Sequence, residues 1–256
     1  MLNNIIFYIL IPLKIIFLIL FPIIGFSILK NITNENNITL FIIICFKITI
    51  YILSYNIEIS KEDYNKYMKY LYSDDKFICI FNHISLLDPF ILFSTFPKIG
   101  FVLNKQKVYE YLNYDDLANT KCGGIFIDAN KKNNVTKKIK QSVDNRKIGE
   151  SVLFISPSVY KLPDEPYNMG EFIKRGAFVN KTKILPIIIK FKDFSIIYNY
   201  EKENIVESFL KLFLFKNYKV KIKVCDMIEP DENETINEYK DRVYNIMNNQ
   251  YKDLKV

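Results

Sequence analysis

The sequence contains one histidine, His83, and an aspartate, Asp88, follows it five positions later. The apolar run 76–82 predicts a strand and a helix is expected to begin near residue 85, so both side chains lie at a strand-to-helix junction. A carboxylate at that spacing can hold one imidazole nitrogen and leave the other free as a base. It then fixes the imidazole tautomer and stabilises the imidazolium, as the acidic member of a hydrolase triad does. The pattern predicts general-base chemistry by His83.

A structural interpretation of the same residues is that His83 caps the helix while Asp88 faces solvent. The bare spacing of these two residues does not decide between the two interpretations. The fuller string N-H-x-S-x-x-D at 82–88 favours the catalytic one, because it ends a predicted strand. Active sites of open α/β sheets gather at the carboxyl ends of the strands.

Short apolar runs alternate with amphipathic stretches from about residue 57 onward. This alternation predicts an α/β fold, a mostly parallel central sheet flanked by helices. The candidate strands are 76–82, 100–103, 124–128, 151–156, 184–190 and 218–225. The candidate helices are 61–72, 85–95, 106–118, 135–147, 171–182, 204–215 and 233–253.

Two apolar segments, 5–29 and 38–55, precede that domain, and each approaches the ~20 residues that cross a bilayer. Each contains one lysine, Lys14 or Lys47, which a long apolar run can tolerate by snorkelling. The short polar link 30–37 predicts an N-terminal hydrophobic helical hairpin. We therefore expect residues 1–56 to anchor the chain to a membrane, as an integral or monotopic segment, and residues 57–256 to form the α/β domain. A signal peptide and a buried core helix are the alternatives.

The composition narrows the class of protein. A mean hydropathy of +0.04 with a quarter of the residues charged excludes a disordered chain and a many-span transporter. Four scattered cysteines and one histidine offer no clustered ligands, so we expect no metal and no cofactor. The net charge of +7 favours an anionic membrane or a phosphorylated substrate, since no nucleic-acid motif is present.

A run of lysines follows residue 130, and two interpretations of it stay open. It is either a solvated helix face or a surface for anionic lipid headgroups. Its members are Lys131, Lys132, Lys137, Lys138 and Lys140.

Four blocks, in order along the chain, resemble the lysophosphatidic acid (1-acylglycerol-3-phosphate) acyltransferase family of glycerolipid acyltransferases. Residues 82–88 resemble its H-x4-D signature, and 123–128 (GGIFID) resemble its second motif, G-x-I-F-I-D-R. Residues 172–178 (FIKRGAF) resemble the stretch after its third motif, and 184–188 (ILPII) resemble its fourth, V-P-I-V-P. The resemblance covers roughly residues 60–250.

Two departures concern the family's acceptor site. Ala129 stands where the second motif has an arginine. Residues 156–161 (SPSVYK) replace the third motif, F-P-E-G-T-R, so that only Pro157 matches and Lys161 stands in place of the arginine.

The resemblance implies a membrane-bound acyltransferase that moves a fatty acyl group from acyl-CoA or acyl carrier protein to a hydroxyl of a lysophospholipid or related glycerolipid. His83 and Asp88 would be catalytic. The residues implied to bind substrate are Ser85, Gly124, Lys161, Lys174 and Arg175. The partners implied are membrane lipids and the acyl thioester; the sequence leaves the oligomeric state open.

Two other functions are compatible with the sequence. The altered third motif fits a catalytically weak or inactive relative that binds lipid. A serine hydrolase using Ser85 or Ser158 ranks last, because no G-x-S-x-G elbow is present.

Overall fold

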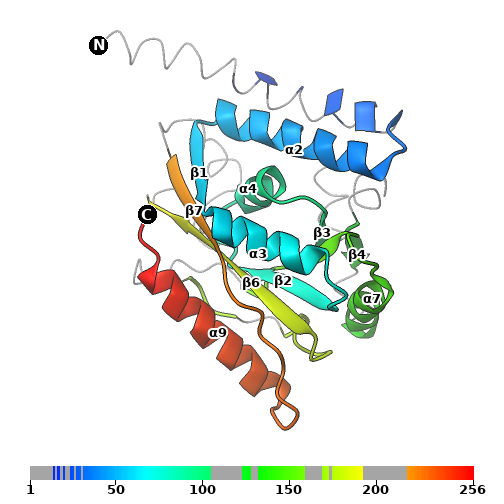
Figure 1. Ribbon diagram of the computed structural model, residues 1–256, viewed down its shortest axis with the longest axis vertical. Coiled ribbons are helices and arrows are strands. Elements are labelled where there is room, and N and C mark those ends of the chain that lie inside the picture. Colours follow the sequence, from blue (N-terminus) through cyan, green and yellow to red (C-terminus); the bar gives the residue numbers. More distant parts are fainter. Residues whose placement is uncertain are drawn as a thin grey trace.

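A seven-stranded sheet in the order β1-β7-β6-β2-β5-β3-β4 forms the centre of the computed structural model (Figure 1). The structure describes residues 14, 16–17, 20, 24–25, 27–29, 31–104, 123–127, 132–158, 169–172, 175–192 and 218–256. The strands are β1 (Tyr55–Ile59), β2 (Phe77–Phe81), β3 (Ile99–Asn104), β4 (Ile125–Ile127), β5 (Val152–Ile155), β6 (Lys183–Phe191) and β7 (Tyr218–Val224). The helices are α2 (Glu35–Ile52), α3 (Lys61–Leu71), α4 (Asp88–Thr95), α7 (Lys132–Asn145) and α9 (Ile236–Asp253).

Strand β2 lies inside the sheet and is buried along its whole length. Its side chains alternate between two apolar cores, with Phe77, Cys79 and Phe81 on one face of the sheet. That face is covered by α2, α3 and α4, whereas Ile78 and Ile80 pack with α7 and α9 on the other. A continuous apolar strand is typical of a parallel sheet covered on both faces.

Every neighbouring pair of strands is parallel except β6 and β7. The carboxyl ends of β2, β5 and β6 therefore meet at one edge of the sheet, where a site is expected. The predicted fold class, a mostly parallel sheet between helices, is confirmed.

All six predicted strands are present, but β1 was not predicted. It follows α2 after only two intervening residues and pairs with β7, so the sheet begins inside the segment assigned to the anchor. The predicted helices 61–72, 85–95, 135–147 and 233–253 correspond to α3, α4, α7 and α9, while 106–118 and 204–215 lie outside the described residues.

The predicted helix 171–182 is wrong in its described part. Phe172 forms an isolated bridge with Ser158, residues 176–180 form turns, and Lys181 has a φ of 47°. Gly176 disfavours a helix at this point because glycine loses the most backbone freedom on ordering. The segment is also held by the bridge at its start and by β6 at its end, which leaves no room for a long helix.

The apolar helix α2 is capped at its amino end by Asn34, whose side chain accepts hydrogen bonds from the backbone N–H groups of Asn36 and Asn37. Within the described residues it is the helix whose length and composition would allow it to cross a membrane. Its Phe46 stacks on Phe93 of α4 with ring centroids 4.8 Å apart. The described residues of the preceding apolar segment are helical and lie along α2 (Figure 1), with Lys14 Nζ donating to Ser54 Oγ.

Candidate active site

The carboxyl end of β2 is clamped to the neighbouring strand β6 by a buried amide. Asn82 follows β2 directly, and its side-chain Nδ2 donates to the carbonyl of Ile189 at 2.8 Å. Its Oδ1 accepts from the N–H of the same residue at 2.8 Å. Two hydrogen bonds to one residue fix the position at which the chain leaves the sheet, immediately before His83.

Asp88 is fully buried at the first residue of α4, and one of its oxygens collects three donors. Oδ2 accepts from the backbone N–H of Ile84 at 2.6 Å and of Ser85 at 2.7 Å. It also lies 2.9 Å from Nδ1 of His83. The two backbone bonds close the turn between β2 and α4, so the turn and the carboxylate hold each other in place.

The His83 imidazole is oriented by this carboxylate. An ionised carboxylate can only accept, so Nδ1 carries the proton and Nε2 presents its lone pair. The His83 side chain is 40% exposed, whereas Asp88 is buried behind it. The arrangement gives an accessible base whose tautomer is set from within the protein.

Burial raises the pKa of the Asp88 carboxyl, because a charge withdrawn from water is disfavoured. The His83 imidazole and the N–H groups of Ser85 and Ile84 oppose that rise. Oδ1 of Asp88 is also buried and makes no hydrogen bond to the described residues. Ionised Asp88 therefore depends on the three donors to Oδ2.

A hydroxyl from the segment that follows the neighbouring strand β5 holds the His83 backbone. Ser158 Oγ accepts from the N–H of His83 at 3.1 Å, and its hydroxyl is hydrogen-bonded to that of Ser156 at 2.8 Å. Ser158 is nearly buried and bridges to Phe172. The sequence indicated this segment as a departure from a motif and Ser158 as a candidate hydrolase nucleophile, not as a support for the His83 backbone. This support has no local signal in the sequence, because it depends on the order of the strands in the sheet.

The structure brings only part of the predicted set of residues to the His83–Asp88 pair. Ser85 is there, but its hydroxyl is buried and lies 3.3 Å from the backbone N of Leu87, from which it accepts a hydrogen bond. Gly124 precedes β4, which is separated from β2 by β5 and β3, whereas His83 follows the carboxyl end of β2. Arg175 is exposed, three residues after bridged Phe172, and precedes a turn instead of opening a helix. Lys161 and Lys174 lie outside the described residues.

Solved structures share the fold of this chain over its full length. The fold is similar to that of the 1-acyl-sn-glycerophosphate (LPA) acyltransferase PlsC from Thermotoga maritima, with a TM-score of 0.64 and 14% sequence identity. The match covers 100% of this chain and 98% of that chain. The sequence matches no family model and no curated protein. At this identity the likeness shows that the two chains share a fold.

The raised pKa of Asp88 has a consequence for stability. A carboxyl whose folded pKa lies above its unfolded value stabilises the fold below about pH 4, and that contribution is lost as pH rises through the folded pKa. Asp88→Asn should therefore be at least as stable as the parent at neutral pH, with a difference that shrinks on acidification. Thermal unfolding of the full chain in detergent, followed across pH, measures this.

Removing the imidazole provides the control for that measurement. In a His83→Ala background the charged Asp88 loses one of its three donors, so the stabilisation by Asp88→Asn should widen. If the stability of Asp88→Asn relative to the parent instead increases as the pH falls, the site favours the charged carboxylate and lowers the pKa of Asp88.

Proposed function

We propose that this protein is a membrane-bound acyltransferase that moves a fatty acyl group from a thioester to the hydroxyl of a lysophospholipid or related glycerolipid. The observation that carries the proposal is the accessible His83 imidazole backed by buried Asp88 at 2.9 Å. The shared fold with an LPA acyltransferase supports the reaction class. The donor is acyl-CoA or acyl carrier protein, and no other cofactor takes part.

In the proposed reaction, Nε2 of His83 removes the proton from the acceptor hydroxyl while its oxygen attacks the thioester carbonyl carbon. Asp88 stabilises the imidazolium through Nδ1. As the tetrahedral intermediate collapses, the C–S bond breaks and the departing sulfur takes the proton from Nε2. A thiolate is a good leaving group, so one base and correct positioning are sufficient.

The geometry gives no support to the serine hydrolase alternative. Its two candidate hydroxyls, of Ser85 and Ser158, are both nearly buried. Ser85 Oγ accepts from the N–H of Leu87, and Ser158 Oγ accepts from the N–H of His83. Within the described residues, neither hydroxyl is hydrogen-bonded to the His83 ring. The direct attack described above needs no such nucleophile.

The first test of the proposed reaction uses His83. His83→Ala and His83→Gln should lower acyl transfer by about 10²–10⁴-fold, the usual contribution of a general base. Asp88→Asn should lower it strongly as well, because the ring loses the acceptor that orients it. The assay is a panel of thioesters and lysolipids, run on membranes that contain the full chain.

Lys69→Ala, an exposed change on α3, is the matched control and should keep the parent rate. Transfer at the parent rate by His83→Ala would refute the assignment of the base. Lysolipid binding by the parent without any transfer would favour the alternative, a lipid-binding relative.

We also propose that Arg175, with Lys161 and Lys174, holds the phosphate of the acceptor. The bridge between Phe172 and Ser158 supports this, because Ser158 is bonded to the His83 backbone. A guanidinium fork matches two phosphate oxygens, and Arg175 is exposed. A turn follows Arg175, so its guanidinium would hold the phosphate without the help of a helix amino end.

Arg175→Ala should raise the KM for a lysophosphatidic acceptor by about tenfold, the loss of one charge-assisted hydrogen bond. The KM for the thioester should stay within the experimental error. Steady-state kinetics with each substrate varied in turn measures the two KM values separately. Lys69→Ala, which removes a positive charge far from the site, is the control and should change neither KM. An unchanged acceptor KM would place the headgroup elsewhere.

The membrane attachment is proposed from the apolar segments. The outer face of α2 exposes a continuous apolar stripe, formed by Leu40, Ile44, Ile48 and Tyr51. Exposure of such a stripe to water is unfavourable. The full chain should therefore stay with membranes through both high salt and carbonate washing, because apolar insertion does not depend on charge. Immunoblots of pellet and supernatant measure this, and release of the chain by high salt would contradict it.

A further inference from the structure

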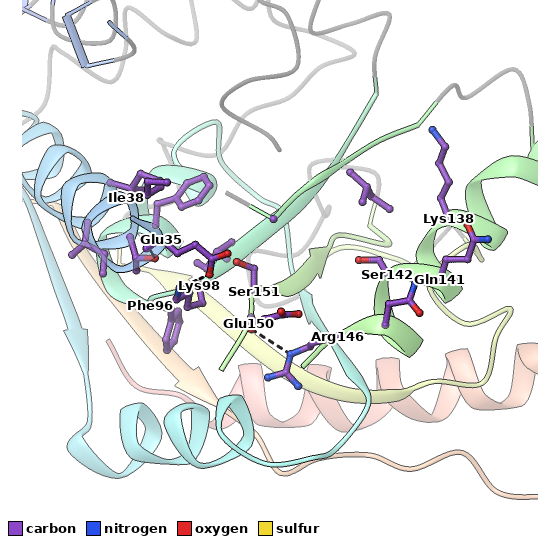
Figure 2. Close-up of a pocket in the computed structure, with 18 residues that line it drawn as sticks. Glu35, Ile38, Phe96, Lys98, Lys138, Gln141, Ser142, Arg146, Glu150 and Ser151 are labelled. Carbon is purple, nitrogen blue, oxygen red and sulfur yellow. Dashed lines mark hydrogen bonds and ion pairs between the residues drawn. The ribbon is translucent and has the colours of Figure 1, made fainter. Parts of the chain in front are cut away.

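A cavity of about 450 Å³ lies beneath α2 (Figure 2). The strand register places it toward the opposite edge of the sheet from His83. Its floor includes Ile99 and Ser151, at the amino ends of β3 and β5. The strand register puts Ile99 level with Val152, and hence with Phe77. His83 follows Phe77 by six residues, roughly 20 Å along the strand direction. The cavity is therefore separate from the proposed active site.

One wall of the cavity is apolar and belongs to the inner face of α2. Its residues are Ile38, Ile42 and Ile43 of α2, Phe93 of α4, Phe96 and Ile125. Each helical residue turns the chain by about 100°, so this face is opposite the exposed stripe of Leu40, Ile44 and Ile48. The helix that is proposed to meet the membrane with its outer face thus covers the cavity with its inner face.

The other wall is polar and rich in hydrogen-bond donors. Gln141 and Ser142 reach the cavity from α7, and Ser151 lies across from them beside Lys98 (Figure 2). The side chains of Gln141, Ser142 and Ser151 make no hydrogen bond to the other described residues, so they are available to a ligand. Lys138 lines the same wall, and its ammonium donates to the carbonyl of Phe126 at 3.0 Å.

The charges on this wall favour an anion. Three cations line the cavity, Lys98, Lys138 and Arg146, against two carboxylates. Glu35 is 78% exposed and lies 3.5 Å from Lys98, whose side chain is only 12% exposed. Glu150 accepts from the N–H of Lys147 through Oε2. The described hydrogen bonds of the Arg146 guanidinium go to backbone carbonyls, so a positive charge remains uncompensated.

We propose that this cavity binds a lipid with an anionic headgroup. The headgroup oxygens lie against Lys138, Ser142 and Ser151, and the acyl chain follows Ile42 and Phe93 under α2. The volume is that of an ordinary ligand pocket. A free phosphate would use the same donors but would leave the apolar wall wet, which favours the amphiphile. The choice of a lipid as the occupant rests on the proposed membrane attachment, and the binding does not involve the proposed catalysis.

The test is a titration of the full chain in non-ionic detergent, followed by native mass spectrometry. Phosphatidylglycerol should bind more tightly than phosphatidylcholine. Its high-affinity binding should saturate at one lipid molecule per protein chain. Lys138→Gln should weaken phosphatidylglycerol binding about tenfold, through loss of one charge-assisted contact. Lys137→Gln removes the same charge from the adjacent position of α7, which does not line the cavity, and should leave the Kd unchanged.

Two further variants separate the lipid from other occupants. Ile42→Ser should weaken the binding of phosphatidylglycerol without affecting the binding of inorganic phosphate. His83→Ala should bind phosphatidylglycerol as the parent does, whether or not the chain is an acyltransferase. Equal affinity for both lipids, or equal weakening by Lys137→Gln and Lys138→Gln, would overturn the proposal. Displacement of phosphatidylglycerol by inorganic phosphate, together with an unaffected Ile42→Ser variant, would instead show a free-anion site.

Discussion

The proposed active site depends on the three hydrogen bonds to one carboxylate, that of Asp88, which is withdrawn from water. An unpaired buried charge costs several kcal/mol, so Asp88 can stay ionised only if its donors are held in place. Two of those donors are backbone N–H groups of the turn, and the third is the imidazole it orients. The turn needs the carboxylate for its own hydrogen bonds. The geometry of the proposed active site is thus a property of the folded backbone, formed before any substrate binds.

Three adjacent strands contribute to that geometry from outside the turn. Asn82 ties the end of β2 to β6, and Ser158, after β5, holds the backbone N–H of His83. Because β2 lies between β5 and β6, the histidine is fixed from both sides. The N–H groups of Ile84 and Ser85 are committed to Asp88, so they are not available to a developing oxyanion. These backbone donors therefore serve to orient the proposed base.

The sequence predicted what depends on local pattern. The alternation of apolar runs with amphipathic stretches predicted the mostly parallel sheet. The spacing from His83 to Asp88, after the apolar run of β2, predicted the pair of residues that the structure brings to 2.9 Å. The prediction from sequence missed β1, a short strand whose pairing with distant β7 has no local signal. It also extended a helix through Gly176, where a bridge from Phe172 to Ser158 prevails over local propensity. The support from Ser158 could not be predicted, because it depends on strand order.

The apolar helix and the candidate site belong to one packed unit. Phe46 of α2 stacks on Phe93 and meets Phe90 edge-on at 5.3 Å, and both rings belong to the helix that begins at Asp88. These close-packed aromatic contacts hold α2 and α4 in a fixed position relative to each other, because protein interiors tolerate little displacement. A protein that takes its substrate from a bilayer has to hold its base at a fixed orientation to that surface. Here α2 provides both the exposed apolar stripe and the contact with α4, so the proposed membrane attachment through α2 would also set the orientation of His83.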